Sequence, residues 1–132
     1  MRRNAVSHPL GLVQRYLAAS EARRLDEARS CLAPGAVLVF PGGQYATPSE
    51  MAVAAARRYR WVKKVYDAWD VAVRQDGTTI VISTGTLYGE NLHGVPFEGI
   101  RYIDRFVVRE GKIIRQDVWN DLDASGVLER RR

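Results

Sequence analysis

The second half of the chain alternates polar and apolar residues, and this pattern constrains the fold more than any other feature. Four such runs cover residues 65–74, 79–88, 97–109 and 112–120. Asp76-Gly77 and Glu110-Gly111 stand between neighbouring runs, and Gly-containing turns of this kind indicate β-hairpins. The sequence therefore predicts an antiparallel meander of four strands.

The first half is expected to be mainly helical. Apolar residues follow Pro9 at helical spacing, which predicts an amphipathic helix over residues 9–23. A short helix from Leu25 to Leu32 should follow it. A strand over residues 36–40 should then end at Pro41-Gly42-Gly43.

A third helix begins at a capping signal. Thr47 is the expected N-cap, Pro48 the first helical residue and Glu50 the third. The alanine-rich segment that follows should be helical to about Tyr59 or Trp61.

Helices followed by strands are typical of an α+β protein. We expect a single domain over residues 1–132, in which three helices from the N-terminal half pack on one face of a curved antiparallel sheet. A sheet of this shape forms a cone, and the open end of a cone is a pocket.

Charge and composition exclude several classes of partner. The net charge of +5 would permit nucleic-acid binding, but part of the excess lies in Arg2, Arg3 and the terminal residues 130–132, and no nucleic-acid-binding motif occurs. No apolar run approaches the roughly 20 residues of a membrane span, and no signal-peptide pattern is present. We expect a cytoplasmic protein that binds neither membrane nor nucleic acid. Cys31, the single cysteine, should be a packed core residue.

Asp104 is the strongest candidate for chemistry. Alternation along its strand places it on the same face as Tyr102 and Phe106, while Arg101 and Arg105 project from the other face. A carboxyl group among apolar neighbours has its charged form disfavoured and its pKa raised. Such a group can act as a general acid, a base or a neutral hydrogen-bond donor. A structural Asp held by a backbone amide or a hydroxyl is the alternative.

The last strand has two faces that alternation alone does not assign. Gln116, Val118 and Asn120 share one face, while Asp117 and Trp119 share the other. An outward Trp119 needs a cover, so we expect a homodimer formed through the outer face of the sheet. Phe40, Tyr59 and Trp69 are aromatic candidates for the wall of a hydrophobic cavity, although they also suit a small core.

Metal and cofactor chemistry has little support. His8 and His93 have no partner at metal-ligand spacing, and no glycine-rich phosphate loop follows a strand. We therefore expect neither a metal nor a cofactor, which leaves acid–base chemistry by carboxyl groups, Tyr and His93.

With its elements in this order, the chain resembles the nuclear transport factor 2-like superfamily, particularly the SnoaL-like polyketide cyclases and the ketosteroid isomerases. The resemblance covers nearly the whole chain and rests on these segments: Val13-Gln14-Arg15-Tyr16-Leu17, Leu25-Asp26, Tyr102-Ile103-Asp104-Arg105-Phe106 and Gly111-Lys112-Ile113. It implies the cone-shaped α+β fold.

The isomerase pattern has a Tyr on the first helix and an Asp on the penultimate strand as its oxyanion hole, which Tyr16 and Asp104 match. Its base precedes a Pro after the first strand, where this chain has Phe40. Because Phe cannot move a proton, the resemblance does not imply steroid isomerisation. The superfamily's epoxide hydrolases place an Asp near Val118, so their triad is also incomplete here.

The SnoaL-like cyclases use an acidic pocket residue to remove a C–H proton next to an activated carbonyl. The resemblance implies that role for Asp104, with Tyr16 polarising the carbonyl oxygen. Asp117, Asp121 and His93 are weaker candidates. We expect a cofactor-independent isomerase, cyclase, dehydratase or lyase that acts on a small hydrophobic carbonyl compound. A non-catalytic ligand-binding or dimeric interaction module is the alternative. The expected substrate-binding residues are Phe40, Tyr59, Trp69, Tyr102, Phe106, Gln116, Val118 and Asn120.

Overall fold

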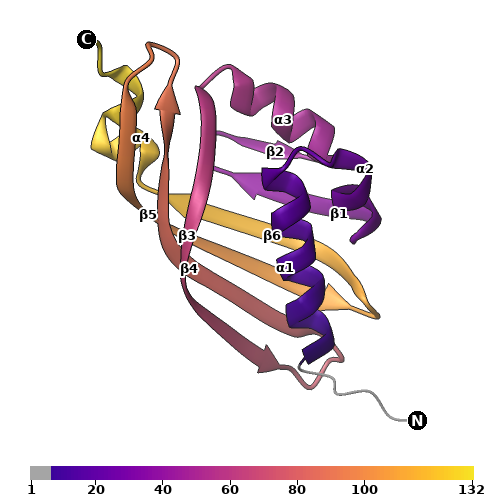
Figure 1. Ribbon diagram of the computed structural model, residues 1–132. Coiled ribbons are helices and arrows are strands. Elements are labelled where there is room, and N and C mark those ends of the chain that lie inside the picture. The colour runs from indigo at the N-terminus through magenta and orange to yellow at the C-terminus, as the bar shows by residue number, and fades with distance from the viewer. Residues whose placement is uncertain (1–6) are drawn as a thin grey trace.

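A curved six-stranded sheet, with strand order β2-β1-β6-β5-β4-β3, carries the helices on one face (Figure 1). The structure is a computed structural model and describes residues 7–132. Its elements are α1 (Ser7–Glu21), α2 (Leu25–Ser30), β1 (Leu32–Phe40), β2 (Gly43–Tyr45), α3 (Pro48–Ala56), β3 (Tyr59–Val73), β4 (Thr79–Asn91), β5 (Pro96–Arg109), β6 (Lys112–Asn120), α4 (Leu122–Ser125) and the 3₁₀ turn η1 (Val127–Glu129). The predicted meander is confirmed as the antiparallel series β3 to β6.

One strand pair departs from the expected antiparallel pattern. β1 pairs with β6 in parallel, with Leu38 opposite Gln116. After α3 the chain crosses to the far edge of the sheet, and the meander then returns strand by strand until β6 lies beside β1. The meander therefore places the last strand next to the first, and the sheet is mixed.

The first helix ends two residues earlier than predicted because the chain turns at a non-glycine residue. Arg23 has a φ of 60°, in the left-handed region. The Arg24 amide donates to the Ala19 carbonyl at 2.8 Å, and the Arg23 amide donates to the Ser20 carbonyl at 3.2 Å. This is a Schellman motif, which usually has glycine at the left-handed position. Without that glycine, the sequence carries no stop signal here.

Other helix and strand boundaries also differ from the prediction. Thr47 is the N-cap of α3, as predicted, and its hydroxyl accepts from the Glu50 amide at 3.2 Å. The helix ends at Ala56, however, so Tyr59 and Trp61 belong to β3 rather than to a helix. The short elements β2, α4 and η1 were not predicted.

A glycine of β4 lies beside an irregularity in β3, at a bend of the sheet. β3 has irregular register between Tyr66 and Ala68, and Gly85 of β4 lies opposite Tyr66. A Cβ atom at Gly85 would lie 2.1 Å from the Val65 carbonyl oxygen, so no side chain fits there. β-Bulges bend and twist the strand that carries them. Figure 1 shows β3, β4 and β5 bending along their length, which produces the predicted curved sheet.

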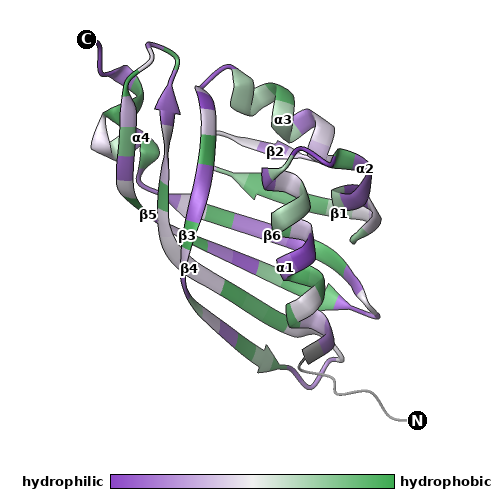
Figure 2. Ribbon diagram, viewed as in Figure 1, coloured by the Kyte–Doolittle hydropathy of each residue, from purple (hydrophilic) through white to green (hydrophobic). Residues whose placement is uncertain are grey.

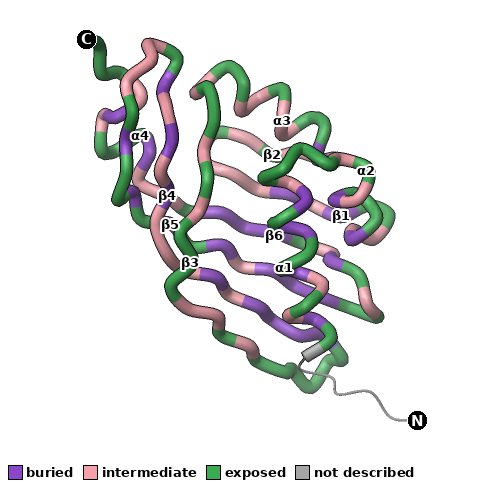
Figure 3. Tube along the Cα trace, in the orientation of Figure 1, coloured by how far each residue is buried: buried purple, intermediate pink, exposed green. Residues whose placement is uncertain are grey.

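The core lies where α1 crosses the strands (Figures 2 and 3). Tyr16, Val13 and Leu17 of α1 pack with Val81 and Phe106 of the sheet. A second apolar cluster, centred on Leu87, Ile100, Leu122 and Val127, fills the other end of the sheet under α4 and η1.

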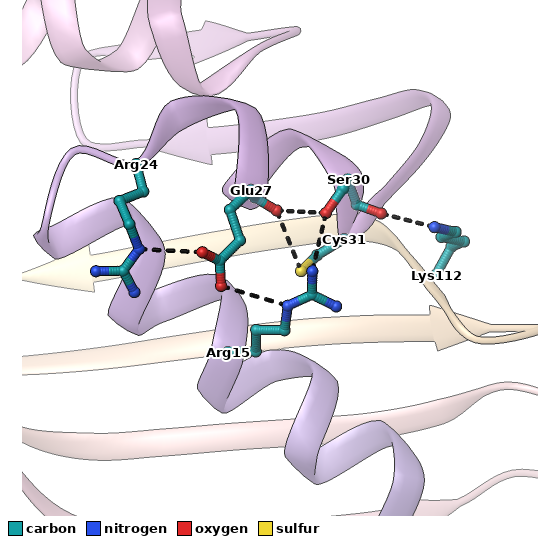
Figure 4. Close-up of polar contacts among 6 residues, drawn as sticks. All are labelled: Arg15, Arg24, Glu27, Ser30, Cys31 and Lys112. Carbon is teal, nitrogen blue, oxygen red and sulfur yellow. Dashed lines mark hydrogen bonds and ion pairs between the residues drawn. The ribbon is translucent and has the colours of Figure 1, made fainter.

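Polar contacts fasten α2 to α1 and to β6 (Figure 4). The Glu27 carboxylate accepts from Arg24 at 3.0 Å and from Arg15 at 3.4 Å. The Lys112 ammonium donates to the Ser30 carbonyl at 2.6 Å. Cys31 is buried beside this joint, as expected for a packing residue, and burial raises the pKa of its thiol.

Residues 7–132 contain neither a candidate membrane-spanning helix nor a candidate metal-binding cluster. No helix within residues 7–132 is both long and apolar enough to span a membrane. No group of three His, Cys, Asp or Glu side chains in the same range is arranged to hold a metal ion. Arg2 and Arg3, part of the basic excess, lie outside the described residues.

Candidate functional site

Asp104 lies on the inner face of β5, as the alternation predicted. It is 1% exposed, and Ser83 and Val118 are its neighbours on the two adjacent strands. Among the described residues, no hydrogen-bond partner reaches either carboxyl oxygen. The alternative of a structural Asp held by an amide or a hydroxyl therefore does not describe it.

The charge nearest to Asp104 is one that the sequence analysis missed. Lys64 Nζ lies 3.5 Å from Asp104 Oδ2. Burial raises the pKa of Asp104, and the attraction of Lys64 opposes that rise. The carboxyl group thus has one cationic neighbour in an otherwise dry environment.

Lys64 belongs to the inner face of β3. It pairs with the buried Leu87, and its ammonium lies 5.1 Å from the centroid of the Tyr102 ring. The sequence offers one signal for this position, because strand alternation puts Lys64 on the same face as its apolar neighbours Val62 and Tyr66. The predicted strand begins at Val65, one residue after Lys64, whereas β3 begins at Tyr59.

Tyr16 reaches the sheet through one hydrogen bond. Its hydroxyl donates to Gln116 Oε1 at 2.8 Å, and its ring packs edge-on against Phe106 at 5.9 Å between centroids. Burial raises the pKa of Tyr16 well above its ordinary value. Tyr16 and Asp104 are not hydrogen-bonded to each other: the Tyr16 hydroxyl is bonded to Gln116, and neither Asp104 oxygen has a partner.

Tyr102 adds a second tyrosine hydroxyl to the buried groups around Asp104. Its oxygen lies 2.9 Å from Ser83 Oγ, and burial raises the pKa of its hydroxyl to about 12. It therefore stays protonated over the physiological range and can donate or accept one hydrogen bond with Ser83.

A small cavity of about 120 Å³ opens between the helices and the inner face of the sheet. Tyr16, Gln116 and Lys64 line it, together with Phe40 and Tyr59 from the expected substrate-binding set. Asp104 is not among its lining residues and lies beyond Lys64. The structure thus assigns the inner face of β6 to Gln116 and Val118, which alternation had left open.

The remaining predicted residues lie elsewhere. Phe106 is fully buried under Tyr16, and Trp69 packs on the core and stacks on Tyr66, so neither lines this cavity. Asn120 uses its side-chain oxygen to accept from the Leu122 amide at 3.1 Å, which holds the start of α4. Tyr102 and Val118 both lie on the inner face, with Val118 beside Asp104.

The weaker acid–base candidates also have other surroundings. Arg115 donates two hydrogen bonds to the Asp117 carboxylate, at 2.8 and 3.0 Å. Asp121 pairs with Arg101 at 2.8 Å. His93 lies in the β4–β5 turn, where its amide donates to Asn91, and it does not line the inner cavity.

A larger hollow of about 960 Å³ lies on the outer face of the sheet. Val65, Ile103 and Trp119 line it and remain 55%, 45% and 55% exposed. This groove is wide and largely apolar, whereas the smaller inner cavity is lined by the buried Tyr16 and by Lys64, which lies 3.5 Å from the buried Asp104 carboxyl group. Perturbed ionisable groups in a cavity are the better indicator of chemistry, so the inner cavity is the candidate active site.

Solved structures with the same fold cover nearly the whole chain. TerC, crystallised with polyporic acid, superposes with a TM-score of 0.76 at 16% identity, over 93% of this chain and 99% of TerC. A putative polyketide cyclase from Xanthomonas campestris pv. campestris gives 0.69 at 18% identity, over 95% and 99%. A putative SnoaL-like polyketide cyclase from Jannaschia sp. CCS1 gives 0.70 at 16% identity, over 100% and 99%.

The chain belongs to the SnoaL-like domain family, whose model matches residues 13–116. The matched segment includes Tyr16, Lys64, Asp104 and Gln116. No curated protein sequence matches the chain. The resemblance inferred from the sequence, and the cone-shaped α+β fold that it implied, are therefore confirmed.

Proposed function

We propose that the protein is a cofactor-independent enzyme of the isomerase, cyclase, dehydratase or lyase type, acting on a small hydrophobic carbonyl compound in the inner cavity. The observation that carries this proposal is the Asp104 carboxyl group, which is buried without a hydrogen bond beside a cavity lined by Tyr16. Buried polar groups are ordinarily hydrogen-bonded, and exceptions often have a catalytic role.

The proposed chemistry is proton transfer next to a carbonyl group. Once Lys64 turns aside, the Asp104 carboxylate would take a proton from the carbon beside the carbonyl. The C–H electron pair becomes the C=C bond of the enolate, and the π pair of the carbonyl moves onto its oxygen. The Tyr16 hydroxyl would turn from Gln116 to the developing oxyanion. The proton then returns to a different atom, or a bond to carbon forms or breaks.

The relatives support the substrate class. TerC was crystallised with polyporic acid, and other structures of this fold are described as putative polyketide cyclases. By analogy with these proteins, we propose that the substrate of this chain is a small, largely apolar carbonyl compound. Phe40, where the isomerases have their base, contributes apolar surface to the cavity.

The test measures proton transfer directly, so it needs no knowledge of the product. A panel of cyclic ketones and 1,3-diketones is incubated with the protein in D₂O, and exchange of the protons beside the carbonyl is followed by ¹H NMR. We expect accelerated exchange with at least one compound, and its loss in Asp104→Asn. Lys63→Met, which changes an exposed residue on the outer face, should leave exchange unchanged. No acceleration with any compound, or full exchange in Asp104→Asn, would reject the proposal.

A second role is favoured by the outer groove. We propose that a second copy of the chain covers Val65, Ile103 and Trp119, because large apolar side chains clustered on one face are costly to leave in water. The same surface would serve a protein that only binds a ligand or a partner, and failure of the exchange assay would favour that role.

A further inference from the structure

The inner cavity has one cation, Lys64, that makes no short hydrogen bond with another described residue. Four charged side chains line it, those of Glu21, Arg23, Arg58 and Lys64. Arg58 pairs with Asp123 at 2.8 Å, and Arg23 donates to the Ser20 carbonyl at 3.0 Å. The Glu21 carboxylate accepts from the backbone amide of Lys64 at 3.1 Å.

The Asp104 carboxylate is the single ion-pair partner of Lys64 Nζ in the described part of the chain, and the contact is long. Asp104 Oδ2 lies 3.5 Å away, beyond the usual range of charge-assisted hydrogen bonds, and the Tyr102 ring offers a π face rather than a lone pair. An ammonium has three N–H donors. Lys64 lines the cavity and its side chain is 23% exposed, so a single long ion pair leaves donors of this ammonium available to a ligand.

Gln116 adds a second donor to the same wall. Its side-chain oxygen is occupied by the Tyr16 hydroxyl. Its amide N–H₂ makes no hydrogen bond within residues 7–132. Two sets of donors in one cavity, one of them charged, favour a ligand rich in acceptors.

We propose that Lys64 is the anion-binding residue of this cavity, and that its ligands are small compounds with an anionic oxygen, either a carboxylate or the enolate of an acidic carbonyl compound. This inference rests on the proposed function and names the substrate class of the same site. Asp104 is then the internal counterion that holds Lys64 when the cavity has no anion. A bound anionic oxygen takes the donors that Asp104 does not reach, and Gln116 supplies one more.

Binding of benzoate, compared with its neutral isostere benzamide, tests the inference by titration calorimetry. Lys64→Met removes the cation and keeps most of the side-chain length. Lys63→Met is the matched control, because it removes one positive charge from the neighbouring position on the outer face. We expect benzoate to bind at least about tenfold more weakly to Lys64→Met, the loss of one charged hydrogen bond. Lys63→Met should bind it as the wild type does, and benzamide should not distinguish the three proteins.

Lys64→Met leaves a buried carboxyl group without its cation and could fail to fold. Two further variants keep the test decisive. Asp104→Asn should bind benzoate more tightly than the wild type, because it removes the anion that competes for Lys64. Lys64→Met/Asp104→Asn, which has neither charge, should lose that gain.

Three results would overturn the inference: equal affinity of the wild type for benzoate and benzamide, wild-type affinity in Lys64→Met, or weaker binding in Asp104→Asn. The outcome is separate from that of the exchange assay. A protein that binds benzoate through Lys64 without exchanging protons would retain the anion site and lose the proposed catalysis. Proton exchange without a preference for benzoate over benzamide would support the proposed catalysis and reject the anion site.

Discussion

Tyr16 and Gln116 are 100 positions apart in the chain, yet the Tyr16 hydroxyl donates a buried 2.8 Å hydrogen bond to Gln116 Oε1. This contact joins α1 to β6 across the inner cavity. It is the direct link between a catalytic candidate and a residue expected to bind substrate.

Tyr16→Phe should destabilise the protein by about 1–3 kcal/mol, because it leaves the buried Gln116 oxygen without a donor. Gln116→Leu should recover part of that loss when combined with it, since the double variant has no unpaired group. Urea unfolding of the two single variants and the double variant checks this. Tyr59→Phe is the control, because no hydrogen bond of its hydroxyl to another described residue would be lost. Strictly additive effects would contradict the prediction.

The stability of the protein should depend on pH through Asp104. Its pKa is raised in the folded state by burial, so the native protein holds this proton more tightly than the unfolded chain does. Stability from this group is therefore full at low pH and falls as pH rises through the native pKa. The stability difference, Asp104→Asn minus wild type, should rise with pH from about 4 upward, by at most about 1.4 kcal/mol per pH unit.

Urea unfolding of both proteins between pH 4 and 8 measures that difference, and other titrating groups cancel to the extent that both proteins share them. A carboxyl-carbon NMR titration of Asp104, assigned with Asp104→Asn, reports the pKa directly. A value at or below that of an exposed Asp would mean that Lys64 outweighs burial, and the pH trend should then reverse.

Gly85→Ala should be strongly destabilising. The new Cβ would lie 2.1 Å from the Val65 carbonyl oxygen and 3.1 Å from the Asp67 amide nitrogen, and backbone atoms inside a sheet cannot easily move away. Overpacking of this kind costs about 1–3 kcal/mol or more. Gly11→Ala is the opposite control, because nothing lies within 4 Å of its Cβ position on α1, and alanine there should stabilise by about 0.5–1 kcal/mol. Thermal unfolding of both variants checks that Gly85→Ala lowers the melting temperature and that Gly11→Ala raises it.

The proposed dimer should dissociate when its apolar face is charged. Trp119→Arg replaces a large apolar side chain of the outer groove with a cation, which a second copy could cover only at the cost of removing the charge from water. Light scattering with size-exclusion chromatography should show a dimer for the wild type and a monomer for the variant. Leu92→Arg, which changes an exposed apolar residue outside this groove, should remain dimeric. A wild-type protein that is monomeric would contradict the proposed dimer.

Much of the fold could be predicted because local patterns and tertiary structure agree. The alternating runs match the meander, and β6 begins and ends where predicted. Thr47 caps α3 because its capping interaction closes within four residues. The errors have two causes. α1 ends in a local turn at Arg23, which lacks the glycine that usually signals it, and β1 includes Pro34 and Gly35 because the distant strand β6 lies beside it.

The sequence by itself determined that Asp104 stands on an apolar face, because alternation is a local property of a strand. Only the tertiary structure decided what Asp104 meets. The registers of β3 against β4 and of β4 against β5 bring Lys64 Nζ to 3.5 Å from the Asp104 carboxyl group. The packing of α1 on the sheet brings the Tyr16 hydroxyl within hydrogen-bonding distance of Gln116. A one-residue shift in a strand register moves its side chains to the opposite face. A pairing between residues 40 or 100 positions apart is therefore a property of the folded sheet.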